Sequence, residues 1–185
     1  MAAYHEELLQ AAKRLNARRN GQKGKLPAAR IRRSISTSYY ALFHFLLAEV
    51  GVKIVGSNGV LLRRRRMMAR TISHRGLRTT LDKVRGENVD PSLADFLRIT
   101  SGSGAVPTPR FVRNLASAFA DAQAKRTDAD YDLNKPLSER DARLLRGRVK
   151  RVIEAWQKAT TASDRDFKHA LCLLVVLKGQ LRSEN

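Results

Sequence analysis

Cysteine is almost absent from this chain of 185 residues, and Cys172 is its only example. One cysteine excludes an intrachain disulfide and a structural zinc site built from several cysteines. Because Cys172 lies in the apolar run 170–177, we expect a small buried hydrophobic residue there and not a nucleophile. The histidines are also dispersed, and none has a second histidine or a cysteine at ligand spacing. They are His5, His44, His74 and His169. We therefore expect no metal and no cofactor.

Carboxylates are scarce as well: 17 Asp and Glu stand against 36 Lys and Arg, which gives a net charge of +19. Such an excess repels itself and does not serve folding, so it indicates an anionic partner, most often a nucleic acid. The alternative is that arginine-rich composition follows from a GC-biased genome and has no function. Aromatic residues make up only 6 %, so the expected core is aliphatic.

No stretch alternates apolar and polar residues with the period of a strand. Apolar residues recur instead at spacings of three and four, which predicts an all-α antiparallel bundle of about five to six helices. We expect one domain over 1–185, with an N-terminal helix and basic connector in 1–24 and the core in 25–182. The start MAAYHEELLQ is not a signal peptide, and 170–177 is too short to span a bilayer, so we expect a cytoplasmic protein without a membrane partner.

The longest predicted helix begins near Ala28 and ends at Val50-Gly51. Its apolar stripe is Ile35, Tyr39, Leu42, Leu46 and Val50. A second line on the helix is polar: Arg33, Ser36 or Thr37, Tyr40 and His44. A row with a cation, a hydroxyl, a phenol and an imidazole is either a buried hydrogen-bond ladder or one wall of a site.

Further helices are predicted on both sides of this one. Their approximate ranges are 4–18, 91–99, 111–126, 138–159 and 164–182, and Gly76 weakens but does not forbid a helix over 70–81. Ser138 and Ser163 each precede an Asp by three residues, as in a capping box, so both are expected N-caps. The segments 18–25 and 100–109 are expected to be mobile connections.

Four arginines follow one another from Arg63 to Arg66. They cover all sides of a helical turn, so they cannot all avoid solvent or an anion. One interpretation is a phosphate clamp, because arginine makes bidentate contacts to phosphate oxygens. Neutralising about four phosphates gives a log–log salt slope of about −3 to −4 for the binding constant. The other interpretation is a solvated basic turn.

His74 is the histidine with the most basic surroundings, since Arg70, Arg75 and Arg78 flank it. If the segment is one continuous helix, Arg70, His74 and Arg78 share a face. Neighbouring cations lower the pKa of an imidazole, so we expect a neutral His74 that can accept a proton from a 2′-hydroxyl. Any basic surface would produce the same pattern.

Arg126 continues the apolar stripe of the 111–126 helix, which places a cation at the end of a buried face. It needs a carboxylate or a ligand anion there. Asp128 and Asp130 are the candidate partners, and Tyr131 follows at the end of the helix.

Three segments resemble the HEPN family of small helical proteins. RRSISTSYYALFHFLLAE (32–49) is similar to the family's signature helix, and RTDADYD (126–132) is close to its R-x-x-A-D-Y-D form. ARTISHR (69–75) resembles the R-x-x-x-H segment of an uncharacterised bacterial subgroup, and the apolar tail 166–177 fits that subgroup too. The resemblance covers about 25–181.

The family includes metal-independent ribonucleases, often toxins or defence effectors, which use an Arg and a His four to six residues later and often form homodimers. Arg126 matches the family Arg. Asp130 or Tyr131 stands where the nucleases keep His, so the standard catalytic pair is not present at this site. A carboxylate beside the scissile phosphate is unfavourable, and tyrosine is a poor base at pH 7.

Two hypotheses follow from the resemblance. In the first, the protein acts on RNA in a toxin–antitoxin, defence or stress context, as a metal-independent ribonuclease: Arg126 and Arg70 stabilise the phosphate, and His74 or His44 is the base or acid. In the second, a non-catalytic module binds RNA or a partner protein, such as an antitoxin or a nucleotidyltransferase. Arg126, Asp130 and Tyr131 then form a structural knot. Under either, the expected RNA-binding residues are Arg63, Arg64, Arg65, Arg66, Arg75 and Arg78.

Overall fold

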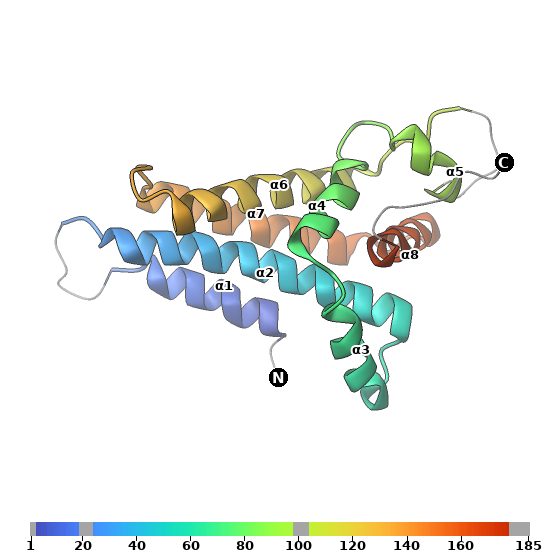
Figure 1. Ribbon diagram of the computed structural model, residues 1–185, viewed down its shortest axis with the longest axis horizontal. Helices are drawn as coiled ribbons and strands as arrows, with labels where there is room; N and C mark the ends of the chain where they lie inside the picture. Colours follow the sequence, from blue (N-terminus) through green and yellow to red (C-terminus); the bar gives the residue numbers. More distant parts are fainter. Residues whose placement is uncertain (1–2, 19–23, 98–103, 178–185) are drawn as a thin grey trace. The chain divides into compact units, whose positions relative to one another are not determined.

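The computed structural model describes residues 3–18, 24–97 and 104–177 (Figure 1). These residues form eight α-helices and two short 3-10 helices. The α-helices are α1 (Tyr4–Leu15), α2 (Ala28–Val55), α3 (Leu62–Ala69), α4 (His74–Asp82), α5 (Ala94–Leu97), α6 (Arg110–Tyr131), α7 (Glu139–Lys158) and α8 (Ala162–Val176). The 3-10 helices are η1 (Gly59–Leu61) and η2 (Pro91–Leu93).

The prediction of an all-α fold is confirmed. Across the described ranges, the only β-type pairing is an isolated bridge between Asn88 and Pro107. The expected number of five to six helices is too low, because the segment between α2 and α6 is divided into short pieces. The expected connection at 19–23, the first residues of the 100–109 loop and the end of the last helix beyond 177 lie outside the described residues.

The chain forms two compact units. Unit 1 consists of Met1–Phe45 and Ala118–Glu154, and unit 2 of Leu46–Ser117 and Ala155–Asn185. The division falls inside α2, α6 and α7, so each of these helices contributes residues to both units. The single domain expected over 1–185 stays a prediction.

In unit 1, α1 lies along the first part of α2 (Figure 1). The Ser34 hydroxyl of α2 donates to the Ala12 carbonyl of α1 over 2.8 Å, and both residues are buried. Glu139 at the start of α7 closes this end of the unit, because its carboxylate accepts from the Leu26 amide at 3.0 Å and its carbonyl accepts from the Asn16 side chain at 3.0 Å.

The apolar stripe predicted for α2 is fully buried, as all five of its residues are at most 4 % exposed. The predicted end at Val50-Gly51 is wrong, because α2 continues to Val55. Gly51 is buried inside the helix, and a Cβ added there would lie 3.3 Å from the Cβ of Arg65. The glycine therefore leaves space for the aliphatic stem of Arg65 and does not terminate the helix.

In unit 2, a buried lysine closes the end of α7. The Lys168 ammonium donates to the carbonyls of Trp156, at 2.5 Å, and Ala159, and it lies 5.2 Å from the Trp156 ring and 5.4 Å from the Phe111 ring. The Trp156 carbonyl belongs to the last turn of α7 and Ala159 follows the helix directly, a place where a cation is favoured by the helix dipole. Trp156 in turn donates to Glu49 of α2 at 2.7 Å.

Cys172 is buried in α8, as predicted. Burial raises the pKa of its thiol to about 12, so the thiolate is not formed at neutral pH. The helices α4 and α5 both pack against α8 within unit 2.

One of the two predicted serine N-caps is present in the structure, and the other is not. Ser138 is confirmed as a cap: its hydroxyl accepts from the Asp141 amide at 3.1 Å, and the Asp141 carboxylate accepts from the Ser138 amide at 2.9 Å. The predicted cap at Ser163 is wrong, because α8 begins two residues earlier. Thr161 is the N-cap, and Asp164 completes its capping box.

The helix α2 is also long and apolar enough to cross a membrane, although half of its most apolar stretch is buried inside the protein. A core helix meets the same criterion, and the buried stripe of α2 is what a core helix needs. The expected cytoplasmic location stays a prediction.

Candidate functional site

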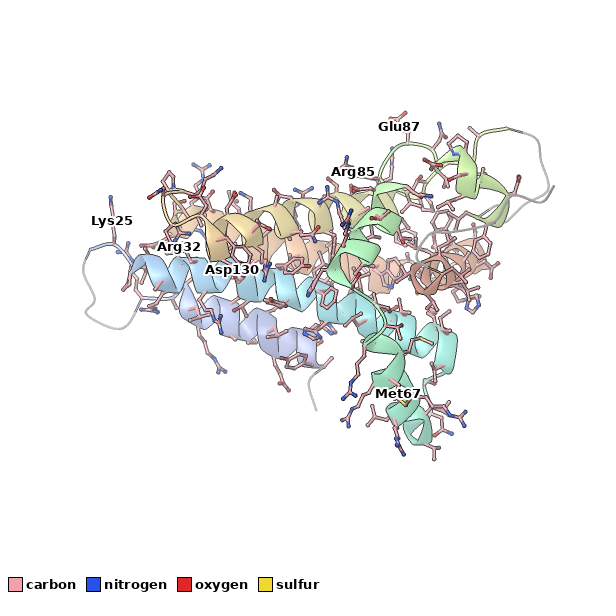
Figure 2. All side chains as sticks on the ribbon, viewed as in Figure 1. Lys25, Arg32, Met67, Arg85, Glu87 and Asp130 are labelled. Carbon is pink, nitrogen blue, oxygen red and sulfur yellow. The ribbon has the colours of Figure 1, made fainter. Side chains whose placement is uncertain are left out.

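Arg32 of α2 joins the segment RRSISTSYY to the segment RTDADYD at the end of α6. Its guanidinium donates to the carbonyls of Asp128 (3.0 Å), Ala129 (3.2 Å), Asp132 (2.9 Å), Leu133 (3.0 Å) and Lys135 (2.8 Å). These carbonyls belong to the last turn of α6 and the turn after it, where a helix end leaves backbone acceptors for other donors. Two of them also accept from backbone amides, Asp128 from Asp132 at 3.2 Å and Asp132 from Lys135 at 3.3 Å. Arg32 therefore caps α6 with a full positive charge. Figure 2 labels Arg32 on α2 and Asp130 near it on α6.

Asp130 is the carboxylate partner that the sequence required for Arg126. The Asp130 Oδ2 atom lies 2.7 Å from the Arg126 Nε atom, and Asp130 Oδ1 accepts from the buried Ser36 hydroxyl. The Nε–H does not point at the carboxylate, so this contact is an ion pair and not an aligned hydrogen bond. The other candidate, Asp128, pairs with Lys135 at 3.6 Å.

Two tyrosine rings flank the Arg126 guanidinium. Its Nη2 donates to the Tyr40 hydroxyl at 3.2 Å, and its Cζ lies 5.8 Å from the Tyr40 ring centre and 5.1 Å from that of Tyr131. Burial lowers the pKa of Arg126, but the bonds to Tyr40 and Tyr131 and the Asp130 charge outweigh it, so the pKa is raised. We call Arg126, Asp130, Tyr131, Tyr40 and Ser36 the Arg126 cluster.

His44 lies one helical turn beyond Tyr40 on α2, with the two ring centres 6.5 Å apart. The Tyr4 ring of α1 packs edge-on against the imidazole at 4.9 Å. Burial lowers the pKa of His44 below its ordinary 6.5, so the imidazole is neutral at pH 7 and able to accept a proton. Two residues of the predicted polar line of α2, Ser36 and Tyr40, thus form hydrogen bonds to α6, as the hydrogen-bond ladder requires. The alternative, that this line is one wall of a site, stays a prediction.

Arg70 and His74 belong to unit 2, whereas the Arg126 cluster and His44 belong to unit 1. The continuous helix that would have placed Arg70, His74 and Arg78 on one face is wrong. Arg70 is the C-cap of α3, and Ser73 begins α4 as its N-cap by accepting from the Gly76 amide at 3.0 Å. The lowered pKa expected for His74 stays a prediction.

Of the six arginines predicted to bind RNA, two are held by other groups of the protein and four are not, among the residues that the structure describes. The Arg65 side chain is occupied, since it donates to the carbonyls of Gly56 at 2.6 Å and Asn58 at 3.0 Å. Arg78 is paired with Asp82 at 2.6 Å. The remaining arginines are exposed, and within the described ranges no ion pair holds them. They are Arg63, Arg64, Arg66 and Arg75.

Met67 lies in the middle of this exposed surface. It is 59 % exposed, and Figure 2 labels it on α3. At helical spacing, Arg63 and Arg64 lie four and three residues before it, and Arg66 is adjacent. We call Arg63, Arg64, Arg66 and Met67 the α3 patch. Met67 shares a face of the helix with Arg63 and Arg64, and Arg66 lies at the side of that face.

Sequence reasoning missed the role of Arg32. Its position beside Arg33 carries no local signal, because the carbonyls that it binds are about 100 residues away in the chain. The separation of bound and unbound arginines on α3 was missed for the same reason. It depends on the turn at Gly56–Asn58, and not on the helix itself.

Among the described residues, no three or more His, Cys, Asp or Glu side chains are grouped so that they could hold a metal ion. Comparison with models of protein families, with curated proteins and with solved structures finds no match to this chain. The site must therefore be interpreted from its own chemistry.

Proposed function

We propose that this protein is a HEPN-like, RNA-directed protein whose α3 patch binds the phosphate backbone. The observation that carries the proposal is the set of exposed cations Arg63, Arg64 and Arg66, which lack carboxylate partners in the described part of the chain. Like charges one turn apart on a helix repel each other, and a polyanion removes that repulsion. Met67 between them adds an apolar contact for a base.

The HEPN-like part of the proposal rests on the two resembling segments and on how they meet. Arg32 and Ser36 of RRSISTSYY bond to RTDADYD, and Tyr40 accepts from Arg126. Residues that are characteristic of the family in sequence thus depend on each other physically. A toxin–antitoxin, defence or stress context, a homodimer and a cytoplasmic location belong to this proposal through the resemblance alone.

A metal-independent ribonuclease is the second candidate, and His44 is the observation that favours it. Its neutral imidazole lies one helical turn after Tyr40, whose hydroxyl accepts from Arg126, so a base and a phosphate-binding cation belong to one unit. Against it, Asp130 is 2.7 Å from Arg126 and repels a phosphate approaching that guanidinium. The geometry favours binding without cleavage, with the Arg126 cluster in a structural role. A protein partner such as a nucleotidyltransferase is the alternative for the same surface.

One experiment separates these functions. Purified protein is mixed with a labelled single-stranded RNA in EDTA, and binding and cleavage are measured together. The wild type is compared with Arg63→Gln/Arg64→Gln/Arg66→Gln and with His44→Ala. We expect binding without cleavage in the wild type and in His44→Ala. We expect binding to be weakened by about 100-fold at 0.1 M salt in the triple variant, since each lost phosphate contact to a single strand costs about fivefold there.

Cleavage that disappears in His44→Ala would establish the ribonuclease and overturn the non-catalytic assignment. The control for charge alone is Lys13→Gln/Arg14→Gln/Arg110→Gln, which removes three exposed cations from α1 and α6. If that control loses as much affinity as the α3 variant, the α3 patch is not the RNA site.

A further inference from the structure

A second basic surface lies on α7, in the part of the helix that belongs to unit 1. Arg140, Leu144, Gly147 and Arg151 follow at spacings of four, three and four, so they form one stripe on the helix. The arginines are exposed, and Leu144 is 56 % exposed. Arg143 is exposed at the edge of the stripe. This surface is independent of the α3 patch, which belongs to unit 2.

The cations of α7 divide into bound and unbound groups. Arg148 pairs with Asp121 at 3.1 Å, and Lys150 pairs with Glu154 at 3.6 Å. In the region that the structure describes, Arg140, Arg143 and Arg151 form no such ion pair. Burial and the nearby Arg143 charge lower the pKa of Arg146. The cations of this helix therefore repel one another.

We propose that this α7 surface is a second binding site for a nucleic-acid backbone, formed by Arg140, Arg143 and Arg151. The proposal rests on the RNA-directed function argued above and deepens it. From Arg140 to Arg151 the helix rises about 16 Å, so the stripe meets several successive phosphates of one strand and not a single anion. Arginine suits these contacts because its planar fork binds phosphate oxygens in pairs.

Gly147 lies at the centre of the stripe. A Cβ at this position would lie 3.3 Å from Nη1 of Arg151, so the glycine leaves room for the Arg151 guanidinium close to the helix backbone. Leu144 beside it offers an apolar surface for a sugar or base. A glycine inside a helix is unfavourable for the helix itself, and here it allows the Arg151 side chain to lie against the helix.

Charge argues against a second copy of the chain as the occupant. Two α7 stripes packed on each other would bring the arginines of one copy against those of the other, and like charges at an interface are unfavourable. An acidic helix of another protein would also be complementary to the positive charge of the α7 surface. A nucleic acid is favoured because the excess is spread over the chain, with 36 basic against 17 acidic residues.

The test is the salt dependence of binding to a labelled oligo-uridine RNA. The full chain is compared with Arg140→Gln/Arg143→Gln/Arg151→Gln, and with the Lys13→Gln/Arg14→Gln/Arg110→Gln control, which removes the same charge elsewhere. We expect the α7 variant to reduce the magnitude of the log–log salt slope by about 2 and the affinity by about 100-fold at 0.1 M salt. Replacement of the same three arginines by lysine should restore the slope, because lysine releases the same counterions. Circular dichroism confirms that each variant is folded.

A slope in the α7 variant that equals that of the control would overturn the α7 site. If the α3 variant loses binding in the same assay, the proposed RNA function survives that result. Absence of RNA binding by the wild type overturns both. Binding of an oligo-glutamate peptide that depends on these arginines, with RNA binding that does not, would assign the surface to an acidic protein instead.

Discussion

Arg32 is the residue on which the connection between α2 and α6 depends most. One guanidinium donates to five carbonyls at and just after the end of α6, two of which also accept from backbone amides. Lysine cannot replace it, because an ammonium has three donors and no planar fork. Without Arg32, the turn that follows Tyr131 loses its main attachment to unit 1.

We expect Arg32→Ala to lower the free energy of unfolding by about 1–3 kcal/mol, since hydrogen bonds from a charged donor are lost and carbonyls are left unsatisfied. Denaturant unfolding measures the change. Arg33→Ala is the matched control, because Arg33 is adjacent, exposed and of the same charge, and it should change stability by no more than about 0.5 kcal/mol. Equal effects of the two substitutions would contradict the capping role of Arg32.

His44 is expected to make the stability of the protein depend on pH. Burial lowers its pKa in the folded protein, whereas the unfolded chain keeps the ordinary value of 6.5. Between the two pKa values the unfolded chain binds more protons, so stability falls as the pH decreases below about 6.5 and levels off under the folded pKa. His44→Gln should remove that part of the decline when unfolding is measured from about pH 7.5 to 5.5. An unchanged decline would show that His44 is not the responsible group.

Part of the Arg126 cluster was predictable from sequence. A cation at the end of a buried stripe requires a counter-ion, and Asp130 lies one helical turn after Arg126, so the pair is local. The contacts of Tyr40, Ser36 and Arg32 are not local, because they depend on where α2 meets α6. Helical periodicity says which residues share a face, but not which face of another helix they meet.

At the scale of elements, α8 gives a direct test of how its start is chosen. Thr161 and Ser163 are both hydroxyl residues near the start, but only Thr161 caps a backbone amide, that of Asp164 at 3.1 Å. Thr161→Ala should cost about 1 kcal/mol of stability, and Ser163→Ala should be close to neutral. The reverse order in thermal or denaturant unfolding would place the N-cap at Ser163.

Two glycines inside helices are expected to respond differently to alanine. At Gly147 a Cβ would meet only the mobile end of Arg151, at 3.3 Å, so Gly147→Ala should stabilise by up to about 1 kcal/mol. At Gly51 it would meet the Arg65 stem at 3.3 Å, and Arg65 is fixed by its bonds to Gly56 and Asn58. Gly51→Ala should therefore be less stable than Gly147→Ala. Equal melting temperatures of the two variants would contradict this packing.

The long helices were predictable because their apolar residues repeat over many turns, as in α2 and α7. The shorter elements were not. The end of α2 was misplaced because a glycine next to a packed side chain is compatible with a helix. The break between α3 and α4 was missed because Ser73 caps a helix only when the chain before it turns away.

The whole molecule carries a net charge of +19, far more than its internal ion pairs require. Internal ion pairs use some of the cations, among them Arg126, Arg148 and Arg78. The exposed arginines of α3 and α7 are not used in this way. Because they occur on helices of both units, the charge is a property of the surface and not of one tail.

The most direct test of nucleic-acid binding is a titration of single-stranded RNA with the wild-type protein over a range of salt concentrations, in EDTA. We expect the logarithm of the binding constant to fall linearly with the logarithm of the salt concentration. The expected slope is about −2 for three phosphate contacts at the α3 patch, and about −4 if α7 adds three more. We also expect the RNA to be intact at the end of the experiment. No binding at 0.1 M salt, or binding that does not change with salt, would contradict the claim that these arginines serve a nucleic acid.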